Sequence, residues 1–201
     1  MSGRPVLYFD VGSPFAWLAA ERAEDVLGVA PVFQPVLLGG LFKLAGRSSW
    51  AIGDPARREA GVLDIEQRAQ AYGLPAVRWP RRWPGDYLTA MRVAVWAQGR
   101  GAAQAYALAA MRRAFTRGCD LSEPEEVRAA ADDAELDGGG ALEAAADPGV
   151  KLALREATQA AYDRGVFGVP TVAVGDELFW GDDKLEDAAT RARPAATEPG
   201  P

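Results

Sequence analysis

The two ends of the chain carry strand signals, whereas the long stretch between them is predicted to be helical throughout. Near the N-terminus, Pro5 to Phe9 is an apolar, strand-like run that leads into Ser13-Pro14 and an apolar helical segment. A second strand is predicted over Ala30–Leu37, where Pro35 indicates an edge position or a bulge. A strand, a helix and a strand in this order predict a βαβ unit with parallel strands.

Strand signals return at the C-terminal end of the chain. Val166 to Val174 is a run rich in β-branched residues, Gly175-Asp176 is a hairpin-turn signal, and Glu177 to Trp180 is the partner strand. A last helix is predicted from Lys184. The tail, residues 191–201, is rich in Pro, Ala and Glu and is predicted to be disordered.

Between these ends, Gly39 to Gly53 is predicted to be a loop and Asp54 to Arg164 to be all helical. The predicted helices are Pro55–Tyr72, Asp86–Gly99, Ala102–Arg117, Pro124–Ala134, a short one at Ala141–Ala146 after a loop at Asp137–Gly140, and Val150–Arg164. The summed order, β-α-β, helices, then β-β-α, predicts an α/β thioredoxin-like fold with a large helical insertion. Residues 1–40 and 165–190 form the discontinuous thioredoxin-like domain in this prediction, and residues 41–164 form the insertion domain.

Composition excludes several classes of function. The chain of 201 residues has a net charge of −6, which argues against a nucleic-acid partner. It has no histidine, so Ser-His-Asp and Cys-His nucleophile systems and histidine-rich metal sites are absent, and no metal is expected. A single cysteine, Cys119, excludes an intrachain disulfide and a C-x-x-C redox pair. No run resembles a signal peptide or reaches the roughly 18 apolar residues of a membrane span, so a cytoplasmic protein with no membrane partner is expected.

Ser13 stands at a strand-to-helix turn where local physics allows more than one role. Serine is a good helix N-cap, and proline is tolerated at the first helical position because its missing N–H would be unpaired there. The free N–H groups and the dipole of a helix N-terminus favour an anion, and a thiolate is such an anion. The alternative is that Ser13 caps the helix and does nothing else.

Three stretches resemble one family. They are YFDVGSPFAWLA at Tyr8–Ala19, PVLLGGLFK at Pro35–Lys43 and GVFGVPTVAVGDELFWGDDKLED at Gly165–Asp187. They are similar to the motifs of the 2-hydroxychromene-2-carboxylate isomerases and kappa-class glutathione transferases, in which Ser-Pro replaces the Cys-Pro of DsbA-type oxidoreductases. The resemblance spans about Val6 to Asp187 and implies a DsbA-like thioredoxin fold with a cis-proline at Pro170.

The resemblance also implies a cofactor, glutathione, with another low-molecular-weight thiol as the alternative. The Ser13 hydroxyl would donate to the sulfur and favour the thiolate. The backbone of Val169, held by a cis Pro170, would pair with the cysteinyl part of the tripeptide. Asp182 and Asp183 match the positions that hold the γ-glutamyl end; the alternative for both is N-capping of the last helix.

Cationic residues are implied at the other end of the tripeptide. Arg57 matches a lysine that faces the tripeptide carboxylate, and Lys43 is expected to assist it; the alternative for both is a solvated surface charge. The chain departs from the family pattern at four places. Asp182 replaces Gln or Ser, where an added carboxylate would repel the γ-glutamyl carboxylate; Arg47 replaces Asn; Arg57 replaces Lys; and Asp86-Tyr87 differs from the usual Asn followed by Ser or Thr.

Trp79, Trp83 and Tyr87 are predicted to wall a pocket for a flat substrate, with packing of an irregular loop as the alternative. The function implied is a glutathione-dependent cis–trans isomerase acting on a small aromatic, pyruvate-type substrate. A kappa-like glutathione transferase is the first alternative, and a non-catalytic thioredoxin-fold binding protein is the second. The resemblance further implies a homodimer.

Overall fold

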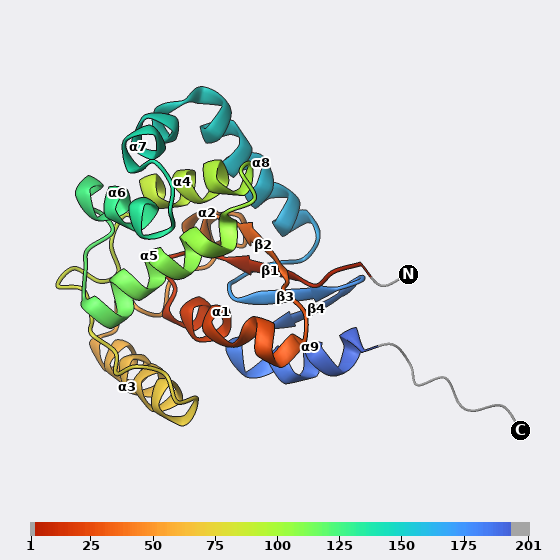
Figure 1. The fold of residues 1–201 in the computed structure, drawn as a ribbon. Coiled ribbons are helices and arrows are strands. Elements are labelled where there is room, and N and C mark those ends of the chain that lie inside the picture. The colour runs from red at the N-terminus through yellow and green to blue at the C-terminus, as the bar shows by residue number, and fades with distance from the viewer. Residues whose placement is uncertain (1–2, 194–201) are drawn as a thin grey trace, which may run out of the picture.

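A four-stranded mixed sheet lies at the centre of the computed structural model, which describes residues 3–193 (Figure 1). Its strands, in the order β2-β1-β3-β4, are β1 (Val6–Phe9), β2 (Val32–Pro35), β3 (Thr171–Val174) and β4 (Glu177–Trp180). Strand β1 pairs in parallel with β2 and antiparallel with β3, and β3 pairs antiparallel with β4. The parallel βαβ unit is therefore confirmed, and Pro35 lies on an edge strand, where a missing N–H is tolerated.

The register of the sheet places the apolar residues of β1 at its centre. Leu7 lies opposite Phe33 of β2 and Val172 of β3, and all three side chains are buried. Phe9 is also fully buried, and its ring meets that of Phe33 edge to face with centroids 5.7 Å apart. These residues form the middle of the core, so the strand that leads into Ser13 is held on both sides.

Helices cover both faces of this sheet (Figure 1). Helices α1 and α9 pack against each other on one face, with α9 also against β3 and β4, while α4, α5 and α8 contact β2. The helices of residues 3–193 are α1 (Pro14–Leu27), α2 (Leu38–Leu44), α3 (Pro55–Ala71), α4 (Leu88–Gln98), α5 (Ala103–Arg117), α6 (Pro124–Asp133), α7 (Gly138–Ala146), α8 (Pro148–Asp163) and α9 (Leu185–Ala192), with a 3₁₀ turn η1 (Asp182–Lys184) before α9. The predicted DsbA-like order of elements is confirmed.

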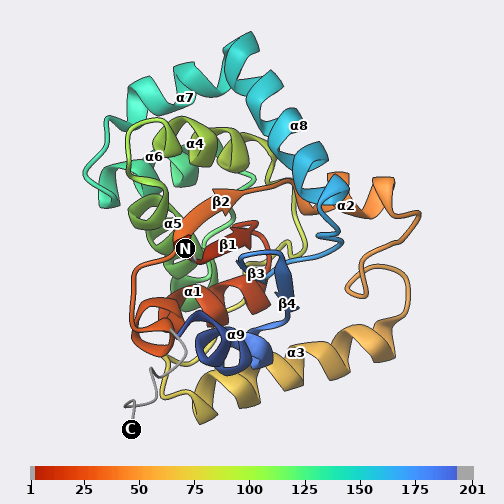
Figure 2. The ribbon, with the colours of Figure 1, turned by 90° about the vertical axis from the view of Figure 1, so that its right-hand side faces the viewer.

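Helix α3 lies apart from the other helices of the insertion. In Figure 2 it lies at the bottom of the molecule, away from α6, α7 and α8. It contacts α1, and its Arg68 pairs with Asp182 of η1. The indole of Trp50, from the segment before α3, lies against Gly61, where a Cβ would overlap the ring. The proposed division of the chain at residues 40/41 and 164/165 stays a prediction.

The prediction of a loop at Gly39–Gly53 is wrong in its first part, because helix α2 occupies Leu38–Leu44. Two glycines lower helix propensity, but tertiary contacts outweigh that cost. The Leu37 N–H donates to Thr158 Oγ1 of α8 at 2.9 Å, and a Cβ on Gly40 would lie 3.1 Å from the Thr158 methyl carbon. The glycine therefore allows the close approach of α2 to α8 that holds the helix in place.

Four boundaries also differ from the prediction. Asp137 caps a helix that begins at Gly138, inside the predicted loop, and Asp147 caps α8 at Pro148. Residues 166–170 form a loop instead of the first part of a strand, since Pro170 has no N–H to donate to a ladder. Helix α9 continues to Ala192, two residues into the predicted disordered tail, of which residues 194–201 lie outside the described residues.

Candidate functional site

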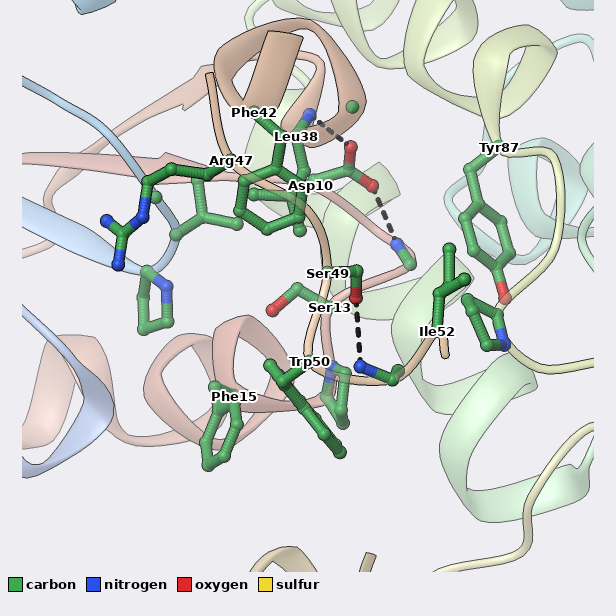
Figure 3. Close-up of a pocket in the computed structure, with 18 of the residues that line it drawn as sticks. Asp10, Ser13, Phe15, Leu38, Phe42, Arg47, Ser49, Trp50, Ile52 and Tyr87 are labelled. Carbon is green, nitrogen blue, oxygen red and sulfur yellow. Dashed lines mark hydrogen bonds between the residues drawn. The ribbon is translucent and has the colours of Figure 1, made fainter. Parts of the chain in front are cut away.

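A cavity of about 850 Å³ opens where the turn between β1 and α1 meets segments from distant parts of the chain (Figure 3). Its lining also includes helix α2 and the loop after it, Arg57 and Arg68 of α3, the loop before β3, the turn η1 and the segment before α4. Of the predicted site residues, Ser13, Arg57, Trp83, Tyr87, Val169, Pro170, Asp182 and Asp183 line this cavity. Lys43 and Trp79 do not.

Ser13 is the N-cap of α1 and is buried at the floor of this cavity. Its Oγ accepts the Ala16 N–H at 3.2 Å, and its own N–H donates to the Asp10 carbonyl at 3.0 Å. Within residues 3–193 the Oγ atom has no other hydrogen-bond partner, so its O–H hydrogen is available to a ligand in the cavity. Pro14 takes the first helical position, so Ser13 stands directly before the helix. Its hydroxyl therefore lies at the positive end of the helix dipole.

Asp10 is a buried carboxylate beside this turn, and sequence reasoning did not single it out. Its Oδ1 accepts the Gly12 N–H at 2.9 Å and its Oδ2 accepts the Leu38 N–H at 2.8 Å, so it ties the turn to the start of α2 (Figure 3). Burial raises the pKa of Asp10 to about 6, although the two N–H donors lower it. The only signal in the sequence is a carboxylate at the end of an apolar strand.

The loop before β3 presents Val169 and Pro170 to the cavity, and the peptide bond between them is cis. The Pro170 carbonyl accepts the Gly181 N–H at 3.0 Å, which fixes this loop to the turn η1. Within the described part of the chain, neither the N–H nor the carbonyl of Val169 has a hydrogen-bond partner. This backbone can therefore pair with an extended ligand, in the manner of an added strand.

Asp182 and Asp183 are adjacent in η1 but lie in different environments. Asp182 is buried, and its carboxylate accepts from Arg68 Nη1 at 3.1 Å and from the Tyr72 hydroxyl at 2.9 Å. Burial raises the pKa of Asp182, and Arg68 and Tyr72 oppose that effect. The Asp183 carboxylate is exposed and lies 4.0 Å from Arg68 Nη1. Asp183 is thus the carboxylate that a ligand can reach, whereas α3 already neutralises Asp182.

Aromatic side chains form one wall of the cavity. Trp50 lies between Phe15 and Trp83, with ring centroids 5.9 Å and 5.6 Å away. Trp83 is buried, and its Nε1 donates to the Gly12 carbonyl at 3.2 Å. Trp79 packs on the far side of Trp83 at 4.6 Å and donates to Glu66, so it supports the wall without lining the cavity.

Tyr87 closes the side of the cavity next to Gly12 (Figure 3). Its ring occupies the space that a Cβ on Gly12 would need, so glycine is required in the turn before Ser13. Its hydroxyl accepts the Gly85 N–H at 3.1 Å, and burial raises the pKa of Tyr87 above its ordinary value. The phenol is therefore neutral at physiological pH.

Two arginines line the outer part of the cavity. Arg57, in the first turn of α3, is exposed and forms no side-chain ion pair within residues 3–193. Arg47 lies with its guanidinium 5.3 Å from the centre of the Phe167 ring, and Phe167 in turn packs on Trp180 at 4.8 Å. Lys43 is exposed on α2 outside the lining.

Sequence reasoning missed Asp10, Trp50 and Arg68 as cavity residues. Trp50 lies in a stretch predicted only as a loop, and Arg68 is one of several charged residues on a helix whose cavity side no pattern in the sequence identifies. Trp50 and Arg68 had no local signal in the sequence, because contacts between distant segments bring them to the cavity.

Comparisons with known proteins agree with this geometry. The family described as "DSBA-like thioredoxin domain" matches residues 6–192. The chain belongs to this family. Among its relatives, a 2-hydroxychromene-2-carboxylate isomerase from Sphingobium xenophagum is 31% identical over 189 residues, covering 89% of this chain and 92% of the relative. Human glutathione S-transferase kappa 1 is 29% identical over 209 residues, covering 90% of this chain and 86% of the relative.

A solved structure, titled as a 2-hydroxychromene-2-carboxylate isomerase, shares the fold of this DsbA-like chain. It superposes with a TM-score of 0.79 at 24% identity and covers 93% of this chain and 94% of that one. The resemblance to the isomerase and kappa-transferase branch of the family is therefore confirmed, and both named relatives are enzymes. Over the described residues, no helix meets the length and hydropathy needed to cross a membrane, and no cluster of three or more His, Cys, Asp or Glu side chains is suited to a metal.

Proposed function

We propose that this protein is a thiol-dependent cis–trans isomerase that uses glutathione and acts on an aromatic, pyruvate-type substrate. The observation that carries the proposal is the Ser13 hydroxyl, which faces the cavity at the N-terminus of α1 with its hydrogen available. The position of the second cysteine of a thioredoxin-type pair is Ala16, and the only cysteine, Cys119, lies outside the cavity lining. A reactive thiol would therefore have to come from a ligand.

The residues of the cavity fit glutathione. The unpaired Val169 backbone suits its cysteinyl peptide groups, and the exposed Asp183 carboxylate suits its ammonium group. Arg57 offers a cation for a carboxylate at the other end. Repulsion between Asp182 and the γ-glutamyl carboxylate would be weak, because Arg68 offsets the charge of Asp182. A cavity of about 850 Å³ leaves space for a second, aromatic molecule beside the tripeptide.

The chemistry that glutathione supplies when bound is reversible addition of its thiolate to a conjugated double bond, about which rotation then becomes free. The chain's own residues would bind the two ligands, orient them and stabilise the charge on the sulfur. Ser13 would donate its hydroxyl hydrogen to the sulfur, and the first-turn N–H groups of α1 would favour the charged form. Trp50, Trp83 and Phe15 would hold a flat substrate ring against this point and exclude water.

A kappa-like glutathione transferase is the second candidate, and the specific observation in its favour is the 29% identity to the human kappa enzyme over 90% of this chain. The two activities differ in outcome, because a transferase keeps the thiol on its acceptor and an isomerase returns it. Mass spectrometry of the product separates them: an isomer has unchanged mass, whereas a conjugate gains the mass of glutathione.

The test begins with calorimetric titration of reduced glutathione into the purified protein, with the ultraviolet absorbance of the thiolate as a second readout. Saturable binding with an ionised sulfur near neutral pH is expected, followed by isomerisation of a hydroxychromene carboxylate. Ser13→Ala should lose the thiolate absorbance and most of the turnover, while Ser13→Thr, which retains a hydroxyl and a cap, should keep part of both. Turnover by Ser13→Ala at the rate of the unaltered protein would refute the proposal.

A further inference from the structure

The cavity lining includes a buried carboxylate that has no role in the proposed function, that of Asp10. It lines the cavity three residues before Ser13, and the two residues close the same turn through the Ser13 N–H and the Asp10 carbonyl. Asp10 as a residue is 3% exposed, a degree of burial that a carboxylate rarely has without a counter-ion.

Among the described residues, no cation is paired with this carboxylate. Its partners are the backbone N–H groups of Gly12 and Leu38, one on each oxygen, and none of the ion pairs within residues 3–193 includes it. The cavity lining also carries the charged side chains of Arg47, Arg57, Asp86, Asp183 and Lys184, and Tyr87 beside Gly12 is a neutral phenol. The other buried carboxylate of the lining, Asp182, is already paired with Arg68.

A thiol that binds above Ser13 as a thiolate must give up its proton, and the chain has no histidine to take it. If the proton left for solvent, the thiolate and the buried Asp10 carboxylate would both be anionic, and Asp10 would have only backbone N–H groups to offset its charge. Like charges in such a site disfavour each other's ionised form strongly. One negative charge shared between the two groups avoids this cost, and the helix dipole and the Ser13 hydroxyl favour the sulfur as its location.

We propose that Asp10 is the proton acceptor for the thiol that binds at Ser13, an inference that rests on the proposed function. The S–H bond breaks with its electron pair remaining on sulfur, and an O–H bond forms on the Asp10 carboxylate. The net charge of the cavity is unchanged by this transfer. The proton returns to sulfur when the thiol leaves the site, so no other reactant is consumed.

The acid–base properties of Asp10 suit the role of proton acceptor. Burial raises its pKa to about 6, so the group is mostly ionised near neutral pH and able to accept a proton, yet it is a far better acceptor than an exposed aspartate. A thiolate placed beside it would raise its pKa further, which would hold the proton on the carboxylate while the thiol is bound.

Counting protons during binding tests the proposal without any turnover. Glutathione is titrated calorimetrically at about pH 7.5 in two buffers of different ionisation enthalpy, and the difference in heat gives the protons released to the buffer. For the unaltered protein we expect thiolate absorbance with close to zero protons released. Below about pH 5, where Asp10 is already protonated, this internal uptake should disappear.

Asp10→Asn should either release about one proton per bound thiol or lose the thiolate absorbance, because the internal acceptor is gone. Asp86→Asn is the matched control: it removes an exposed carboxylate from the cavity rim, and the amide oxygen can still accept the Leu88 N–H. Its proton count should equal that of the unaltered protein.

Leu38→Pro provides a second test that keeps the carboxyl group. Leu38 is the first residue of α2, a position that tolerates proline, so the substitution removes one N–H donor to Asp10 with little effect on the helix. The pKa of Asp10 should rise, and the pH range in which the proton is retained should shift upward with it. A residue that only clamps the turn would change stability in both variants but not the proton count.

Three results would overturn the inference. The first is release of about one proton by the unaltered protein with thiolate formed, and the second is zero release by Asp10→Asn with the thiolate absorbance intact. Both would leave the proposed function standing. The third, absence of glutathione binding to the unaltered protein, would overturn the proposed function and this inference together.

Discussion

Arg68 of α3 donates from Nη1 to the buried carboxylate of Asp182 at 3.1 Å, and this ion pair ties α3 to the turn that presents Asp183. Bulk water does not solvate the Asp182 carboxylate, because its side chain is 2% exposed. Arg68→Ala should lower the free energy of unfolding by roughly 3 kcal/mol, since it leaves a buried carboxylate without its cation. Thermal unfolding monitored by circular dichroism measures the loss.

The pH dependence distinguishes this effect from lost packing. Burial raises the pKa of Asp182 in the folded protein, and removal of Arg68 raises it further. A folded pKa above the unfolded value stabilises below the unfolded pKa, so the Arg68→Ala deficit should be smaller in acid and grow as the pH rises. Arg68→Lys, which keeps the charge without the forked geometry, should recover part of the stability. A deficit independent of pH would contradict an electrostatic origin.

Ser13→Ala should lower the free energy of unfolding by about 1 kcal/mol, because Oγ no longer accepts the Ala16 N–H at the helix N-terminus. Asp147→Ala is the matched control, since it removes the N-cap of α8 outside the cavity lining and should cost a similar amount. Only Ser13→Ala is expected to reduce turnover, by roughly 100-fold. Equal loss of activity in both variants would mean that stability alone sets the rate.

Arg57→Ala should weaken glutathione binding by about threefold to fivefold at low salt, and the difference should shrink as salt is added. Lys43→Ala should have no effect, because Lys43 lies outside the cavity lining whereas Arg57 is part of it. Titration calorimetry at two ionic strengths measures both. If the two variants lost affinity equally, a diffuse electrostatic effect would replace a specific contact as the explanation.

Gly61→Ala should displace the indole of Trp50, because the added Cβ would overlap that ring. The alanine gains up to about 1 kcal/mol of helix propensity, but overpacking costs about 1–3 kcal/mol, so a net loss of stability is expected. The near-ultraviolet circular dichroism should change, and the KM for an aromatic substrate should rise. Gly139→Ala, on α7 with an ordinary contact distance of 3.4 Å, is the control and should leave both unaltered.

Asp10 should give the folded protein a pH-dependent instability. Its folded pKa of about 6 exceeds the ordinary value of 3.8, so its contribution to stability is present below the lower value and is lost as the pH rises to about 6. Between these two pH limits, the contribution of Asp10 to the free energy of unfolding falls by about 3 kcal/mol. Asp10→Asn should therefore flatten the stability profile between pH 4 and pH 6, whatever constant offset it adds. Parallel profiles of the two proteins would contradict the raised pKa.

Much of the fold follows from local patterns in the sequence. The apolar run before Asp10 predicts β1, Ser13-Pro14 predicts the start of α1, and the hairpin signal at Gly175-Asp176 predicts the β3–β4 turn; all three are present. Helix α2 was missed, because Gly39 and Gly40 argue against a helix locally. Its stability comes from Thr158 and Asp10, which are far away in the chain.

By itself, then, the sequence determined the order of strands and helices, the absence of a thiol at the Ser13 turn and the resemblance to its family, because each depends on residues that are neighbours in the chain. Only the tertiary structure decided which charges the cavity offers. It paired Asp182 with Arg68, left Asp183 exposed, placed Lys43 and Trp79 outside the lining, and buried Asp10 against two backbone N–H groups. The physical reason is that desolvation and ion pairing depend on segments that meet only after folding.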